Sequence, residues 1–166
     1  MAPKQKVALV IGRFQPLHLG HLHAIKDILK ANSSLILIIG SSQAKRTEKN
    51  PFSALERKEM IVSCFKKEGL LSKTKILLLE DQNHHENWTK SVLKICKPAN
   101  RLYSGNWLVQ HLLRPHMEVH TMKSDVKISA TMIRKLISAK IAGWKKFVPV
   151  EIANYLVKNK LLGAVK

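Results

Sequence analysis

The regular alternation of short apolar runs with segments of helical spacing is the strongest constraint on how this chain folds. Residues 35–40 form a continuous apolar run rich in β-branched side chains, as expected for a strand buried on both faces. Further strands are predicted at residues 6–12, 75–79, 101–104 and 117–122. Helices are predicted at residues 19–31, 53–69, 88–96, 107–113, 129–142 and 149–159. This alternation predicts an α/β fold: a Rossmann-like three-layer αβα sandwich with a mainly parallel sheet of about five strands.

The length of 166 residues and the hydrophobic content of 45% predict one domain over residues 1–166. The C-terminal helices from about residue 129 are expected to pack on the same core. Cys64 and Cys96 lie in helical apolar patterns, so we expect buried, reduced thiols. No apolar run approaches the roughly 20 residues that span a bilayer, and no leader segment precedes the first strand. Both observations favour a cytoplasmic protein without a membrane partner.

The chain is strongly basic, with a formal net charge of +18 and a pI of about 10.2. This balance suits polyanionic partners such as nucleotides, nucleic acid or an acidic membrane surface. Most of the excess is lysine scattered along the chain, which is typical of a solvated surface. No aromatic residue lies between basic residues as a base-stacking platform requires, so a nucleic-acid partner is not expected.

Residues 12–21 join the first strand to the first helix through a loop that contains glycine and proline. A strand, such a loop and a helix N-terminus together form a phosphate-binding geometry. His18 and His21 lie on the first helical turn, where residues three apart share a face. They could bind zinc, although a third ligand is missing, or donate hydrogen bonds to a polyphosphate. A purely structural role is the third interpretation, although a capped helix needs neither imidazole.

Other candidate residues follow the ends of the predicted strands. These segments are residues 41–50, 81–88, 104–106 and 128–134. In a parallel sheet, ligands bind outside the carboxyl ends of the strands, at the point where the strand order reverses. We therefore expect these segments to meet residues 12–21 at one edge of the sheet.

Two motifs resemble the signatures of the nucleotidylyltransferase superfamily. The first is His18-Leu19-Gly20-His21, preceded by Gly-Arg-Phe-Gln-Pro at 12–16. The second is Ile-Ser-Ala-Thr-Met-Ile-Arg at 128–134. Together with Gly-Ser-Ser-Gln-Ala at 40–44, Asn-Pro-Phe-Ser at 50–53 and Tyr-Ser-Gly-Asn at 103–106, they look like archaeal-type nicotinamide-nucleotide adenylyltransferases. The resemblance covers nearly the whole chain.

The resemblance implies an enzyme of NAD biosynthesis that converts nicotinamide mononucleotide (NMN) and ATP into NAD and pyrophosphate by direct in-line displacement. It implies Mg²⁺ held mainly by the ATP phosphates, with no metal ligand from the protein, and homo-oligomers, commonly hexamers. The implied catalytic residues are His18, His21, Arg134 and Lys49. The implied ATP-binding residues are Gly12, Arg13, Phe14, His18, Gly20, His21, Lys49, Ser129, Thr131 and Arg134. Phe14 either lines the cleft or packs beneath it.

The NMN-binding residues implied by the resemblance are Asp81, Trp88 and Asn106, and Trp88 would stack on the cationic nicotinamide ring. A core position for Trp88 and a helix-capping role for Asp81 are the structural alternatives. Two residues depart from the family pattern. Many relatives carry Arg at the position of Lys49, whose role Lys45 or Arg46 could share, and relatives carry Asn at the position of His85.

Three further interpretations remain open. Trp107 and Trp144 lie in apolar helical patterns and are expected in the core or an interface. The acceptor could instead be phosphopantetheine, FMN or a polyol phosphate with CTP, which a panel of acceptors would decide. The chain could also be a basic nucleotide or nucleic-acid binding module without turnover, which would bind RNA in a salt-dependent way and release no pyrophosphate.

Overall fold

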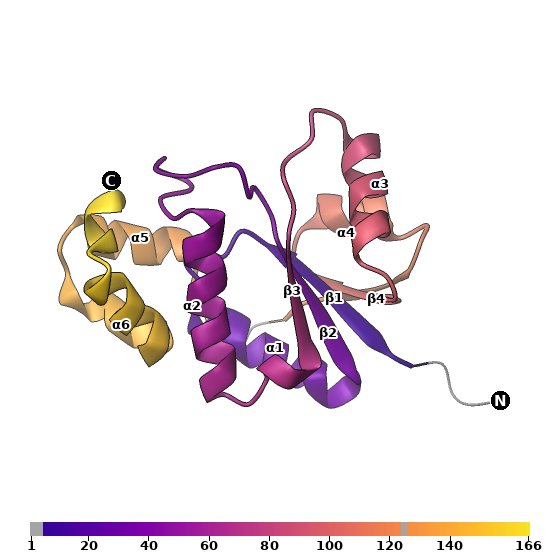
Figure 1. Cartoon of the computed structure of the whole chain (residues 1–166), viewed down its shortest axis with the longest axis horizontal. Helices are drawn as coiled ribbons and strands as arrows, with labels where there is room; N and C mark the ends of the chain where they lie inside the picture. The colour runs from indigo at the N-terminus through magenta and orange to yellow at the C-terminus, as the bar shows by residue number, and fades with distance from the viewer. Residues whose placement is uncertain (1–4, 124–125) are drawn as a thin grey trace.

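A five-stranded parallel sheet forms the centre of the computed structural model, which describes residues 5–123 and 126–166 (Figure 1). The strands are β1 (Val7–Gly12), β2 (Ser34–Ile39), β3 (Thr74–Leu78), β4 (Arg101–Ser104) and β5 (Glu118–Thr121). Their order in the sheet is β3-β2-β1-β4-β5, and every neighbouring pair is parallel. The first four residues, on which the expectation of no leader segment rests, lie outside the described part of the chain.

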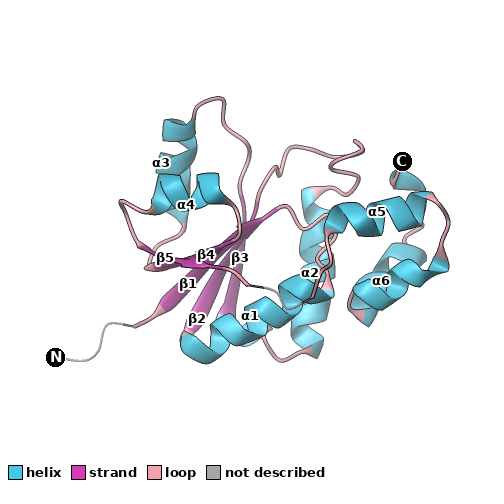
Figure 2. Ribbon diagram, turned by 180° about the vertical axis from the view of Figure 1, so that it is seen from behind, coloured by secondary structure: helices cyan, strands magenta, loops and turns pink. Residues whose placement is uncertain are grey.

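Helices cover both faces of this sheet (Figure 2). The α-helices are α1 (Leu19–Ala31), α2 (Ala54–Lys67), α3 (His85–Ile95), α4 (Trp107–Leu113), α5 (Ala130–Ser138) and α6 (Val150–Lys158). Short 3₁₀ helices are η1 (Leu71–Lys73), η2 (Ala142–Phe147) and η3 (Leu161–Ala164). Helices α3 and α4 lie on one face and α1 and α2 on the other, where α5 and α6 pack beside α2 (Figures 1 and 2). The predicted Rossmann-like α/β fold is confirmed.

Two apolar cores hold the layers together. Alternate residues of β1 divide between them: Ala8 and Val10 face the core of α1, α2, α5 and α6, whereas Val7 and Leu9 face the core of α3 and α4. Strand β2, whose apolar run contains no alternation, contributes to both cores in the same way. The sheet is therefore buried on both faces.

Strand β1 lies at the centre, between β2 and β4. From β1 the chain moves outward through β2 to β3, then returns across the sheet to β4 and β5. The strand order thus reverses at β1, and the crevice at its carboxyl end is where such sheets bind ligands. Gly12, the last residue of β1, opens this crevice.

Several element boundaries differ from the sequence prediction. Helix α3 begins at His85 rather than at residue 88, and α5 ends at Ser138 rather than at 142. The early end of α5 has a local cause, because Lys140 adopts a left-handed conformation with φ of 57°. The Ile141 N–H then donates to the Leu136 carbonyl and the Lys140 N–H to the Ile137 carbonyl, which closes the helix with a Schellman motif.

The three tryptophans have different environments. Trp144 of η2 is buried in the core, as predicted. Trp107 is 74% exposed because the first residue of α4 faces away from the sheet, so a core position for it is wrong and an interface position stays a prediction. Within the described residues, no helix combines the length and the apolarity needed to cross a bilayer.

Candidate active site

The loop that follows β1 is shaped by an aromatic ring packed against a glycine. Phe14 is buried and has a positive φ of 51°, which turns its ring back over Gly12. A Cβ atom on Gly12 would come within 2.8 Å of this ring, so only glycine fits there. The ring also meets the imidazole of His21 edge-on, with centroids 5.1 Å apart. Phe14 therefore both packs beneath the crevice and lines it.

The two histidines of the first motif cap helix α1. His18 is the N-cap, and its Nδ1 accepts a hydrogen bond from the His21 backbone N–H at 3.3 Å. The His21 Nδ1 in turn accepts from the His18 backbone N–H at 3.4 Å, and the rings stack with centroids 3.7 Å apart. The sequence reasoning that helix capping needs neither imidazole was therefore wrong. Because both Nδ1 atoms accept, each neutral ring carries its proton on Nε2 and can donate it to a ligand.

Burial keeps this histidine pair uncharged. Desolvation lowers the pKa of His18 to about 4. Desolvation, followed by the nearby His18, lowers the pKa of His21 to about 3. At neutral pH the pair thus offers two N–H donors rather than two cations.

The lowered pKa values of His18 and His21 predict that the folded protein loses stability in acid. In the unfolded chain both imidazoles titrate near 6.5, so the unfolded state binds more protons than the folded state between about pH 6.5 and pH 4. The free energy of unfolding is therefore highest above pH 6.5 and falls as the pH drops towards 4. Urea unfolding at pH 7.5, 5.5 and 4.5 measures this slope. A variant with both histidines replaced by asparagine should show a shallower slope, and an unchanged slope would contradict the assignment.

The second motif supplies the opposite wall through helix α5. Ser129 is the N-cap, and its Oγ accepts from the Met132 backbone N–H at 3.1 Å. Arg134, half-buried one turn further on, donates from Nη1 to the Gln15 carbonyl at 3.0 Å and from Nη2 to Thr131 Oγ1 at 3.3 Å. Burial, and then the charge of Arg13, lowers the pKa of Arg134. This pairing brings together two motifs that lie more than a hundred residues apart.

Between the two motifs lies a hollow of about 350 Å³, called the donor hollow below. Its walls are Arg13, Phe14, Gln15, His18, Gly20, His21, Met122, Ile128, Ser129, Ala130, Thr131 and Arg134. Two guanidinium groups and two imidazole N–H donors face this space, and no carboxylate of residues 5–123 or 126–166 lines it. Such a lining suits a polyanion of the size of a triphosphate.

A smaller hollow of about 140 Å³, called the acceptor hollow below, lies beyond β3 and β4. It is lined by Asp81, Gln82, His85, Trp88, Leu108, Val109 and Leu112. Trp88 is half-buried on α3 and also touches the core beneath it. One indole flanked by aliphatic side chains, with a carboxylate at the edge, suits a flat cationic ring.

Asp81 is held by the loop that follows β2. Its Oδ1 accepts from the Ser41 hydroxyl at 3.0 Å, and its Oδ2 accepts from Gln43 Nε2 at 3.1 Å. The Gln43 side-chain oxygen accepts in return from the Asp81 backbone N–H. Asp81 therefore caps no helix, because the N-cap of α3 is His84.

Three of the predicted site residues, Gly12, Lys49 and Asn106, line neither hollow. Gly12 is covered by the ring of Phe14. Asn106 is the N-cap of α4, and its Oδ1 accepts from the N–H groups of Leu108 and Val109. Lys49 is exposed in a turn and lines neither hollow. Arg46, considered as a substitute for Lys49, forms an ion pair with Glu56 instead.

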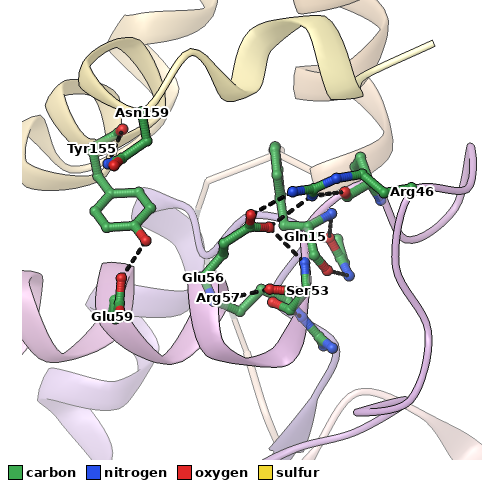
Figure 3. Close-up of polar contacts among 10 residues, drawn as sticks. Gln15, Arg46, Ser53, Glu56, Arg57, Glu59, Tyr155 and Asn159 are labelled. Atoms are coloured by element: carbon green, nitrogen blue, oxygen red, sulfur yellow. Dashed lines mark hydrogen bonds and ion pairs between the residues drawn. The ribbon is translucent and has the colours of Figure 1, made fainter.

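Sequence reasoning gave no role to two residues that build the site, Gln15 and Arg57 (Figure 3). The buried Gln15 side chain forms a reciprocal pair with Phe52, donating to its carbonyl at 2.9 Å and accepting from its N–H at 3.0 Å. Arg57 of α2 is 0% exposed and donates to backbone carbonyls of three segments. In the sequence, Arg57 had two signals: the Glu56-Arg57 pair that follows Asn-Pro-Phe-Ser in the family resemblance, and the presence of an arginine within the apolar pattern of α2.

Comparison with known proteins relates this geometry to characterised sequences. The sequence profile of the cytidylyltransferase-like family matches residues 9–136. A nicotinamide-nucleotide adenylyltransferase of Thermococcus onnurineus (strain NA1) is 32% identical over 166 residues, covering 97% of this chain and 87% of that one. A nicotinamide-nucleotide adenylyltransferase of Picrophilus torridus is 37% identical over 153 residues, covering 90% of this chain and 89% of that one.

A solved structure with the same arrangement is a bifunctional NMN adenylyltransferase/ADP ribose pyrophosphatase from Francisella tularensis, complexed with AMP and Mn ion. It is 25% identical and superposes with a TM-score of 0.76 over 98% of this chain. The match covers 52% of that protein, so the present chain spans about half its length. From the family profile, the sequence identities and the fold together, the chain belongs to the cytidylyltransferase-like family and, within it, to the archaeal-type nicotinamide-nucleotide adenylyltransferases.

Proposed function

We propose that the protein transfers the adenylyl group of ATP to the 5′-phosphate of NMN, giving NAD and pyrophosphate. The observation that carries this proposal is the pairing of the two hollows at the carboxyl end of one sheet. The donor hollow presents two guanidinium groups and two imidazole donors, and the acceptor hollow presents an indole face. Membership of the adenylyltransferase family supports the same assignment.

The reaction needs no nucleophile from the protein. An oxygen of the NMN phosphate attacks the α-phosphorus of ATP, and the bond from that phosphorus to the bridging oxygen of the β-phosphate breaks. The electron pair leaves with pyrophosphate, so catalysis consists of positioning and of stabilising the charge that develops on the leaving group.

Each donor-side residue then has a defined task. His18 and His21 donate Nε2–H bonds to the α- and β-phosphate oxygens, while Arg134 and Arg13 contact the triphosphate. Ser129 and Thr131 present the first turn of α5 to the leaving pyrophosphate. Gly12, Phe14 and Gly20 shape the loop around the nucleotide. Lys49 is exposed and lines neither hollow, and its proposed task is to contact the triphosphate from the loop that follows β2 once ATP is bound.

Magnesium enters this scheme as part of the substrate, MgATP. Over residues 5–123 and 126–166, no three His, Cys, Asp or Glu side chains come together to hold a metal ion. The described residues that line the donor hollow include no carboxylate, and this set of donors suits a Mg²⁺ ion carried mainly by the phosphates. When bound, the ion neutralises charge on the pyrophosphate.

On the acceptor side, Trp88 is proposed to stack on the nicotinamide ring. That ring is cationic in NMN, which favours the electron-rich face of an indole. Asp81, oriented by Ser41 and Gln43, is placed to contact the riboside of NMN. Asn106 caps α4 with its side-chain oxygen, and its amide N–H₂ group remains available to the nucleotide.

The experiment that tests the function is an acceptor panel with purified protein, Mg²⁺ and either ATP or CTP. Release of pyrophosphate is measured with NMN, deamido-NMN, phosphopantetheine, FMN and glycerol phosphate. The proposal expects turnover with ATP and NMN, and formation of NAD. Faster turnover with another acceptor would reassign the substrate. Salt-dependent RNA binding with no pyrophosphate release would favour the binding module instead.

Replacing Trp88 by leucine tests the acceptor hollow separately. The leucine retains apolar contact with the core but loses the cation–π stack, so the KM for NMN is expected to rise about tenfold. The KM for ATP should change less than twofold. Steady-state kinetics with each substrate varied in turn measures both values, and Trp107→Leu serves as the control because Trp107 lines neither hollow. A rise confined to the KM for ATP would contradict the assignment.

We also propose that the whole chain works as one catalytic domain in a cytoplasmic homo-oligomer. In support of one domain, buried residues of α5 and α6, such as Ile133 and Ile152, share an apolar core with strand β1. In support of self-association, α2 and α6 expose Leu55, Val150 and Val157.

A further inference from the structure

Arg57 is buried without a carboxylate partner. Its side chain is 0% exposed, and within the described residues it forms no ion pair. Burial, and then the charge of Arg13, lowers its pKa to about 10, so it still carries a full charge at neutral pH. An unpaired buried charge is costly, and an apolar side chain of similar size would fill the same space at lower cost. Packing alone therefore does not account for an arginine here.

The hydrogen bonds of the guanidinium group join two loops, residues 12–18 after β1 and residues 40–53 between β2 and α2. Nη1 donates to the carbonyls of Arg13 at 2.7 Å and Gly40 at 2.8 Å, and Nη2 donates to the carbonyl of Ser41 at 3.0 Å. Nε donates to the carbonyl of Ser53, at the start of the same helix, at 3.2 Å. The planar fork of arginine can satisfy such a spread of acceptors, whereas the single ammonium group of lysine cannot.

These contacts reach both hollows. The Arg13 carbonyl belongs to the loop that lines the donor hollow. On the other side, Ser41 donates its hydroxyl to Asp81, which lines the acceptor hollow. Arg13 and Asp81 are thus connected through one guanidinium group and one hydroxyl. The loop after β1 and the loop after β2 are also joined by the bond from Gly40 N–H to the Gly12 carbonyl and by the reciprocal pair of Gln15 with Phe52. The bonds of Arg57 differ from these because they also hold Ser41, the residue that orients Asp81.

We propose that Arg57 is a positioning residue that sets the donor loop (residues 12–18) and, through Ser41, the acceptor loop (residues 81–88) at the separation required for in-line attack. The inference rests on the proposed function. Each loop binds its own substrate through its own side chains, so loss of Arg57 leaves binding of either substrate largely intact. What is lost is the alignment of the attacking oxygen with the α-phosphorus, for which a misplacement of about 1 Å can cost about 100-fold in rate.

The test compares Arg57→Met, Arg57→Lys and wild type at a temperature well below each melting point. Arg57→Met is expected to lower kcat about 100-fold while the KM values for ATP and NMN change less than about threefold. Arg57→Lys should fall between Arg57→Met and wild type. Met60→Ala is the matched control, because Met60 is buried on the same helix but its apolar side chain carries none of the hydrogen bonds that join the loops. It should lower the melting temperature but leave kcat within twofold of wild type.

Ser41→Ala keeps the inference testable if Arg57→Met folds poorly. This change removes the bond to Asp81 from a residue that is not expected to touch substrate, and it should lower kcat about tenfold at unchanged KM. When Ser41→Ala is combined with Arg57→Lys, the fold-loss in kcat should be smaller than the product of the two single fold-losses. Both substitutions weaken the same connection from Arg57 through Ser41 to Asp81, so their effects are not independent.

Two results would overturn the inference. The first is a kcat of Arg57→Met within threefold of wild type, and the second is a fold-loss in kcat for Met60→Ala equal to that for Arg57→Met. The proposed function is judged separately, from wild type with NMN. If wild type uses another acceptor instead, the same ratios of kcat are measured with that acceptor, so the two failures remain distinct.

Discussion

Replacing Arg134 by alanine is expected to lower kcat/KM for ATP about 1000-fold, the largest effect of any single substitution considered. The half-buried guanidinium is the cation that α5 contributes to the donor hollow, and its geometry is fixed by bonds to the Gln15 carbonyl and Thr131 Oγ1. Removing a preorganised charged donor from a partly desolvated site costs about 100- to 1000-fold in rate. Arg134→Ala also removes the hydrogen bond to the Gln15 carbonyl, which holds α5 to the loop after β1, and this loss lowers the rate further.

Pyrophosphate release with ATP varied at saturating NMN measures this effect. The matched control is Lys135→Ala, since Lys135 is the next residue on the same helix and points to solvent. Its kcat/KM should stay within about twofold of wild type. Arg134→Lys should recover only part of the loss, because an ammonium group keeps the charge but cannot form both bonds at once. Near-normal turnover in Arg134→Ala would remove Arg134 from the mechanism.

The second large effect is expected for His18→Asn, a substitution that separates the two tasks of this histidine. Asparagine is among the best N-cap residues, so its side-chain oxygen can replace Nδ1 as the acceptor of the His21 N–H. It has no equivalent of the Nε2–H donor. We therefore expect kcat to fall about 300-fold, while the melting temperature changes by less than about 3 °C.

His18→Ala is the comparison that completes this test. Alanine removes both the cap and the donor, so it should lose a similar factor in kcat and also about 1 kcal/mol of stability. Thermal unfolding and steady-state kinetics on the two variants measure both quantities. Full activity in His18→Asn together with instability in His18→Ala would mean that His18 serves only to begin helix α1.

The sequence predicted the helices and strands well, because the residue patterns that indicate them lie within each segment. Residues 19–31 have an apolar stripe of helical period, and α1 covers the same residues in the structure. Strand β2 was recognised from a run without polar residues, which only a strand covered on both faces tolerates. The two motifs at residues 12–21 and 128–134 were expected to meet, and the bond from Arg134 to the Gln15 carbonyl joins them.

The remaining features depend on contacts between distant segments. Arg57 looks like an ordinary helix residue until the loops after β1 and β2 fold around its guanidinium group. The exposure of Trp107 depends on how α4 rests on the sheet, which its seven-residue sequence does not specify. The stacked, uncharged state of the His18–His21 pair arises from its burial beside Phe14 and so has no local signature.

The contacts of Arg57 also bear on how this protein can change. Its four acceptors are main-chain carbonyls, which every amino acid possesses. Side chains in the surrounding loops can therefore be substituted without loss of the four hydrogen bonds of Arg57, provided that the backbone keeps its path. His85 lines the acceptor hollow and is not among the groups that Arg57 or Ser41 contacts in the described residues. Side chains such as His85 can therefore be exchanged to change which acceptor binds while the backbone that sets the reaction geometry stays in place, which makes this hollow the natural target for engineering a new acceptor.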